Sequence, residues 1–147
     1  MSIIQLLYVS RATVPMTETD LVDIVDRSCR KNARLGITGL LLYGRGNFIQ
    51  VLEGEATRVD ELMEVIKQDP RHKDVEILQN APIRARLFKQ WGMGLAVLHG
   101  DRSIDRYRLQ SVMHMAERAP RSDPRRVALD ILSEFKNWVS QGDSRAA

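Results

Sequence analysis

The chain has 147 residues, of which 44% are hydrophobic and 28% are charged, with a formal net charge of +3. This composition is ordinary for one globular domain. The small positive charge favours an acidic partner only weakly, so we do not expect the chain to bind nucleic acid. The single cysteine, Cys29, excludes an intramolecular disulfide and a cysteine-based zinc site, and no apolar run approaches the ~20 residues that span a membrane.

Residues 3–10 form the first predicted strand, because apolar side chains fill both of its faces. They lack a basic leader and a cleavage site, so we expect a strand rather than a secretion signal and a cytoplasmic protein without a membrane partner. A helix is predicted over residues 17–31, where Thr17 and Asp20 approximate a capping box. Ile24, Ser28 and Asn32 recur every four residues and therefore share one line of that helix.

Residues 36–54, GITGLLLYGRGNFIQVLEG, predict a β-hairpin. Two apolar runs, residues 37–43 and 48–53, flank a Gly-Arg-Gly-Asn cluster that contains the glycines a tight turn needs. Both faces of the second strand are apolar, so we expect it to be buried, and Gln50 is the exception within it. A buried primary amide needs hydrogen-bond partners, because leaving it unpaired costs on the order of 1–3 kcal/mol.

A second helix is expected after the hairpin, with Thr57 as its cap and Pro70 at its end. Strands follow at residues 75–78 and 92–98, joined by an irregular segment over residues 82–91. The resulting order, β-α-β-β-α-β-β, predicts an α+β fold with a ferredoxin-like five-stranded mixed sheet and two helices on one face.

Two later segments with helical periodicity, residues 104–119 and 127–141, predict C-terminal helices on the other face of the sheet. We therefore expect residues 1–98 to form the main domain, residues 99–142 a helical cap or output segment, and residues 143–147 a disordered tail.

No catalytic motif is visible, and the three histidines do not have metal-ligand spacing. We therefore expect neither enzyme activity nor a bound metal. The residues that the fold should bury over the sheet are isoleucines on the two helices together with hydroxyl and amide side chains. Such a set suits a flat aromatic ligand with a hydrogen-bonding edge.

Six motifs together resemble the BLUF domain, a blue-light sensor that uses a flavin. They are LLYVSRA, SCRKN, GITGLLLY, FIQVLEG, DPRH and R-x-F-x-x-W-x-M, and they follow the family's order over about residues 3–98. The C-terminal third resembles the helical cap of short, single-domain members, with no fused output enzyme.

The resemblance implies that FAD is bound between the two helices of residues 1–98. The implied cofactor-binding residues are Ile24, Ser28, Lys31, Asn32, Gln50, Ile66, Asp69, Arg71 and His72. Lys31 departs from the family pattern, since some members carry an amide or a histidine there, and this leaves the contacts of the rim open.

The resemblance also implies the photochemical roles. Tyr8 would donate an electron and a proton to the excited flavin, and Gln50 would change its hydrogen bonds by rotation, tautomerisation or both. Trp91 and Met93 would report the state of Gln50, and which of the two faces the flavin varies within the family.

Two other functions stay open on the residues alone. One is a flavin-free, ferredoxin-like module for protein interaction, and the other is a hydrolase of the acylphosphatase type, although no glycine-rich phosphate loop follows the first strand. For the sensor, we expect light-dependent binding to an unidentified downstream signalling protein and self-association into a homo-oligomer.

Overall fold

A computed structural model describes residues 2–89, 93–99, 102–105 and 120–146. The strands are β1 (Ile3–Ala12), β2 (Thr38–Gly44), β3 (Asn47–Glu55), β4 (His72–Ile83), β5 (Gly94–His99) and β6 (Arg102–Asp105). The helices are α1 (Glu18–Leu35), α2 (Ala56–Lys67) and α4 (Pro124–Ala146).

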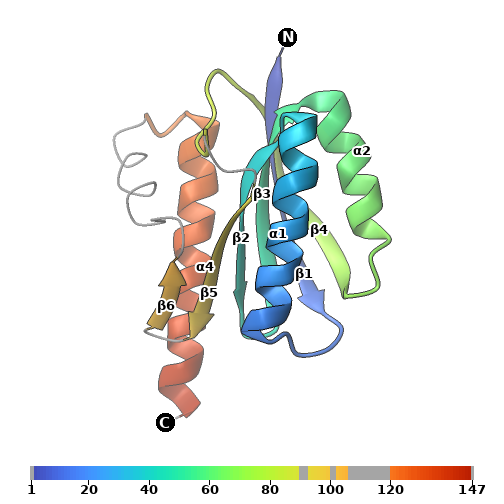
Figure 1. Cartoon of the computed structure of the whole chain (residues 1–147). Helices are drawn as coiled ribbons and strands as arrows, with labels where there is room; N and C mark the ends of the chain where they lie inside the picture. The colour runs from blue at the N-terminus through green and yellow to red at the C-terminus, as the bar shows by residue number, and fades with distance from the viewer. Residues whose placement is uncertain (1, 90–92, 100–101, 106–119, 147) are drawn as a thin grey trace.

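The strands form one mixed sheet in the order β4-β1-β3-β2-β5-β6. Helices α1 and α2 cover one face of it, and α4 crosses the other (Figure 1). The predicted α+β class, with a mixed sheet and helices on both faces, is confirmed, and the short strand β6 adds a sixth member at the edge. Within the described part of the chain, no helix combines the length and apolar character needed to cross a membrane.

The sheet is buried on both faces because successive side chains of a strand point to opposite sides. Leu6 and Tyr8 of β1 pack with the core under α1 and α2, whereas Leu7 packs with Leu132 of α4. All of β3 except its two end residues is buried, as its two apolar faces predict.

The β2–β3 hairpin is closed by a two-residue turn, Arg45-Gly46, in which both residues have positive φ, 50° and 72°. Such a turn matches the twist of the strands that it joins. Asn47 stabilises it by donating a side-chain hydrogen bond to the Arg45 carbonyl at 2.8 Å. The predicted tight hairpin is therefore confirmed, and its turn sets the register of β3.

Arg45 also connects the hairpin to the opposite layer of the fold. Its guanidinium lies 4.1 Å from the centroid of the Trp138 ring on α4 and donates to the Trp138 carbonyl at 3.2 Å. This contact explains why an arginine is found at a turn position that asparagine or aspartate usually occupies.

Helix α1 begins as predicted but ends later. Thr17 and Asp20 form a complete capping box, in which each side chain bonds the other residue's backbone N–H. The helix continues to Leu35 and ends at Gly36, whose φ of 67° is typical of a C-cap glycine. Asn32 therefore lies inside the helix rather than at its end, with a side chain that is 2% exposed.

Several other boundaries differ from the sequence predictions. Helix α4 covers Pro124–Ala146 instead of residues 127–141, so it includes residues 143–146 of the expected disordered tail. Helix α2 begins at Ala56, before Thr57, and has no side-chain cap. Strand β4 extends over residues 72–83 instead of 75–78, because pairing with β1 continues along its length. Residues 104 and 105 belong to β6 rather than to a helix, because they pair with β5, and residues 106–119 lie outside the described residues.

The two threonines provide a paired test of capping. Thr17→Ala removes an observed cap and should lower the free energy of unfolding by about 1 kcal/mol. Thr57→Ala changes an exposed residue inside α2 and should stay within about 0.5 kcal/mol of the parent. Urea denaturation of the two variants measures both values, and equal losses would contradict the capping assignment.

Candidate functional site

An open pocket of about 580 Å³, counting its solvent-facing part, lies between α1, α2 and the sheet. The lining residues are Tyr8, Ile24, Ser28, Asn32, Leu41, Phe48, Gln50, Leu62, Ile66, Asp69, Arg71 and His72.

The pocket brings together most of the residues singled out in the sequence. Lys31 does not reach it: its side chain is exposed and lines a separate surface with Arg27 and Arg34. Met93 is fully buried and contacts Gln50 rather than the pocket itself. Trp91 lies outside the described residues.

Three pocket residues were not singled out from the sequence: Leu41, Phe48 and Leu62. Phe48 shares a face of β3 with Gln50, and Leu41 lies directly opposite Gln50 across the β2–β3 pair. Strand alternation and hairpin register could have identified both. Nothing in the sequence distinguishes Leu62 from the other apolar residues of α2.

Gln50 uses both ends of its amide. It lies opposite Tyr8 in the β1–β3 register, and the Tyr8 hydroxyl donates a hydrogen bond to its Oε1. Its Nε2 points the other way and donates to the Met93 sulfur at 3.3 Å. All three side chains are buried, so the amide links a phenol on β1 to a thioether beside β5 away from bulk water.

Burial, and to a smaller degree the negative charge of Asp69, raises the pKa of the Tyr8 phenol well above its ordinary value. Tyr8 therefore keeps its proton at physiological pH and remains the donor in its bond to Gln50.

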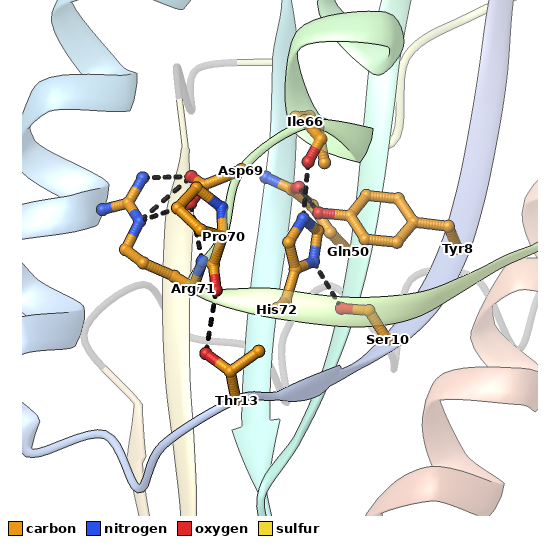
Figure 2. Close-up of polar contacts among 9 residues, drawn as sticks. All are labelled: Tyr8, Ser10, Thr13, Gln50, Ile66, Asp69, Pro70, Arg71 and His72. Atoms are coloured by element: carbon orange, nitrogen blue, oxygen red, sulfur yellow. Dashed lines mark hydrogen bonds and ion pairs between the residues drawn. The ribbon is translucent and has the colours of Figure 1, made fainter.

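The rim of the pocket is built by the segment between α2 and β4. The Arg71 side chain pairs with the Asp69 carboxylate, with its Nε 2.9 Å from Oδ1, and the Arg71 backbone N–H bonds the same oxygen at 3.0 Å. This pairing lowers the pKa of Asp69 and raises that of Arg71. Thr13, the residue after β1, donates to the Pro70 carbonyl at 2.9 Å and so holds the turn as well (Figure 2).

His72 connects the rim to the sheet and to α2. Its Nε2 lies 2.5 Å from the Ile66 carbonyl, and its Nδ1 lies 2.8 Å from the Ser10 hydroxyl (Figure 2). A carbonyl can only accept, so Nε2 carries the proton, and in the neutral ring Nδ1 accepts from Ser10. The ring orientation is therefore fixed by two different elements.

The residues of the pocket fit a flavin ring. Isoleucines from α1 and α2 face the space above the sheet, with Leu41 and Phe48 at its floor. The amides of Asn32 and Gln50 supply both donors and acceptors, as the alternating carbonyl and N–H groups at the edge of a flavin require. A pocket of this kind beside a buried tyrosine–glutamine pair is suited to a flavin-dependent sensor.

Comparison with known proteins identifies the family. A model described as "BLUF: Sensors of blue-light using FAD" matches residues 3–94, so the chain belongs to the BLUF family, whose cofactor is FAD. The matched region is a sensor rather than a catalytic domain, as the sequence predicts.

Among curated relatives, the photoactivated adenylate cyclase subunit beta of Euglena longa is 47% identical over 83 residues, covering 56% of this chain. The corresponding subunit of Euglena gracilis is 44% identical over 87 residues, or 58% of the chain. The match spans only 10% of each of these relatives.

Solved structures also share the fold, and two of them serve as examples. The dark-state structure of the BLUF protein BlrB is 35% identical, with a TM-score of 0.64, and the match covers 86% of this chain and 90% of that one. A manganese and cy-diGMP complex of Klebsiella pneumoniae BlrP1 is 31% identical, with a TM-score of 0.74, over 91% of this chain and 32% of that one.

The raised pKa of Tyr8 predicts that this phenol ionises at a higher pH than an ordinary tyrosine does. The phenol should remain protonated through pH ~10, where an ordinary tyrosine ionises, and its contribution to stability should be lost only as pH rises further towards the folded-state pKa. Phenolate absorbance of the native protein and of Tyr8→Phe should therefore coincide up to pH ~10.5. An additional tyrosine titrating near pH ~10 in the parent would contradict this.

Proposed function

We propose that the chain senses blue light through FAD held non-covalently in the pocket between α1 and α2, with Tyr8 and Gln50 as the switch. The observation that carries this proposal is the geometry of Gln50, which accepts from Tyr8 at one end and donates to Met93 at the other. An amide with different partners at its two ends has two distinguishable orientations.

Tyr8 is the proposed donor. When bound, FAD supplies the absorption of blue light and, once excited, an electron acceptor. The Tyr8 phenol is neutral, as an ordinary tyrosine is at physiological pH, and burial raises its pKa further. Its proton is already donated in a hydrogen bond to Gln50 Oε1. Loss of an electron makes a phenol strongly acidic, so the existing hydrogen bond gives that proton a direct path to the amide.

Gln50 is the proposed moving part. Rotation, tautomerisation or both would change the group that its amide presents to Tyr8 and to Met93. Since the side chain is only 7% exposed, water offers little compensation for a lost partner. Each arrangement therefore requires its own set of hydrogen bonds, and this condition gives two discrete states.

The proposed cofactor contacts follow the lining of the pocket. Ile24 and Ile66 would enclose the ring, and Ser28 and Asn32 would bond its polar edge. Asp69, Arg71 and His72 of the rim would hold the remainder of the cofactor. We leave Lys31 out of this set because its side chain lies on another surface.

The output is proposed to be light-dependent contact with a separate signalling protein in the cytoplasm, with self-association of the sensor. Residues 1–98 would act as the sensor and residues 99–142 as the output segment. The packing of α4 against the back of the strands that carry Tyr8 and Gln50 supports this division. The relatives named as subunits of a photoactivated adenylate cyclase support a role of this kind.

Tyr8→Phe tests the proposed donor. The variant keeps the ring volume, so the purified protein should remain yellow, but the reversible red shift under blue light should disappear with the phenolic proton. Tyr43→Phe is the matched control, because Tyr43 is also buried on this face of the sheet yet lies outside the pocket lining. An intact red shift in Tyr8→Phe would refute the role, and a colourless parent would favour the flavin-free interaction module.

Gln50→Leu tests the proposed switch. Leucine is close to glutamine in volume and can bond neither Tyr8 nor Met93, so flavin binding should survive while the red shift is lost. Absorption spectra before and after blue light measure both properties. A normal shift in this variant would show that the spectral change originates elsewhere.

A further inference from the structure

A second buried polar group lies on the strand that carries Gln50. Glu53 follows Gln50 by three residues on β3, so its side chain points to the opposite face of the sheet, towards α4. It is 0% exposed and does not line the flavin pocket. A carboxylate in such a place requires a full set of donors, because leaving it without them is costly.

Four hydrogen bonds satisfy the carboxylate. Oε2 accepts from Gln5 Nε2 at 3.0 Å and from the Leu87 backbone N–H at 2.8 Å. Oε1 accepts from Thr38 Oγ1 at 3.2 Å and from the Phe88 backbone N–H at 2.9 Å. Each oxygen therefore holds one side chain of the sheet and one backbone amide of the segment that follows β4.

That segment, residues 84–89, is attached to Glu53 by a third bond. Arg86 donates to the Glu53 carbonyl at 2.9 Å and to Thr38 Oγ1 at 3.0 Å. Leu87 and Phe88 are buried in the core beneath α4. One residue of β3 thus fixes the path of residues 86–88.

The chain reaches Met93 five residues after Phe88. Met93 accepts from Gln50 through its sulfur, and its carbonyl accepts from the Cys29 thiol at 3.8 Å. Strand β3 therefore contacts the Met93 side chain through Gln50, and it contacts residues 86–88, which precede Met93 in the chain, through Glu53.

The same carboxylate acts on α4. Arg125, in the first turn of that helix, has a raised pKa, chiefly because of its hydrogen bonds to Asp123 and in smaller part because of the Glu53 charge. Gln79 of β4 also donates to the Pro124 carbonyl at 2.9 Å. The start of α4 and residues 84–89 therefore lie on the same side of the sheet as Glu53.

We propose that Glu53 is a positioning residue: by holding the amides of Leu87 and Phe88, it fixes Met93 relative to Gln50 and so sets the balance between the two hydrogen-bond arrangements of Gln50. This inference rests on the proposed function, since it needs Gln50 to switch. It assigns Glu53 no contact with the cofactor, from which the whole thickness of the sheet separates it.

Glu53→Gln gives a sharp test because it is isosteric. Each carboxylate oxygen holds one backbone amide of residues 84–89, so an NH₂ group in place of either oxygen leaves Leu87 or Phe88 facing a donor. The variant should bind flavin and show the red shift, but its recovery in the dark should differ from that of the parent by at least about threefold.

Gln5→Met is the matched control. It removes a hydrogen bond of the same buried carboxylate from the sheet side and leaves both backbone amides in place. Its stability should fall, but its recovery should stay within about 1.5-fold of the parent. Parental recovery in Glu53→Gln, or equal changes in the two variants, would overturn the proposal.

Hydrogen exchange on the unmodified protein gives a second test, which applies even if Glu53→Gln fails to fold. Coupling between two sites is reciprocal, so a change at Gln50 must alter the opening of the Glu53 contacts. The amides of Leu87 and Phe88 should exchange at least about threefold faster or slower under continuous blue light than in the dark. Equal rates would overturn the proposal.

The two tests separate this inference from the proposed function. If the parent shows no red shift, or Gln50→Leu keeps it, the proposed function fails. The proposed function holds if the parent shows the red shift and Gln50→Leu does not. If, in that case, Glu53→Gln recovers at the parental rate, or the Leu87 and Phe88 amides exchange equally fast in light and dark, only the role of Glu53 is wrong.

Discussion

The hydrogen bond from Tyr8 to Gln50 is the interaction on which the site depends, and the sheet creates it. The two residues lie on different strands and meet because β1 and β3 pair with Tyr8 opposite Gln50. Backbone pairing is cooperative along the whole strand, so the position of this one contact is specified by many others. A polar pair that would be costly to bury by itself is thereby held in place by the hydrophobic packing on both sides of the strands.

The sheet that carries the Tyr8–Gln50 pair separates two sides of the molecule with different chemistry. On the side of α1 and α2 the sheet borders a pocket with apolar walls and a rim of charged and hydrogen-bonding groups. On the side of α4 the core is continuous, and its main polar feature is the carboxylate of Glu53. The first side is suited to receiving a cofactor, whereas the second is suited to passing a small displacement to a packed helix, since close-packed interiors transmit strain.

Much of this arrangement could be predicted from the sequence. Alternation of apolar residues located the strands, the glycines located the hairpin turn, and Gln50 stood out because an amide rarely occurs in such a strand. The pocket residues of α1 followed from their four-residue spacing, although the helix runs one turn beyond the predicted end. These features depend on residues that are close together in the chain, so they can be recognised in short stretches of the sequence.

The remaining features depend on distant contacts. Thr57 has the right chemistry for a cap, yet strand β3 runs directly into α2 and leaves no capping position for it. Pairing with β1 extends β4, and pairing with β5 forms β6, at positions where the local sequence gives no strand signal. Glu53 resembles an ordinary end-of-strand charge, and its four donors come from segments up to 48 residues away.

The two-residue turn at Arg45-Gly46 limits the insertions and deletions that the sequence of such a sensor can accept during evolution. Because strand side chains alternate, Gln50 shares its parity with Tyr8, whereas Glu53 has the opposite parity. Without a compensating bulge, insertion or deletion of a single residue in the turn would exchange the two faces of β3, placing the Gln50 amide under α4 and the Glu53 carboxylate on the side of α1 and α2. The length of this turn therefore helps to determine which side chains face the pocket, although neither Arg45 nor Gly46 lines it.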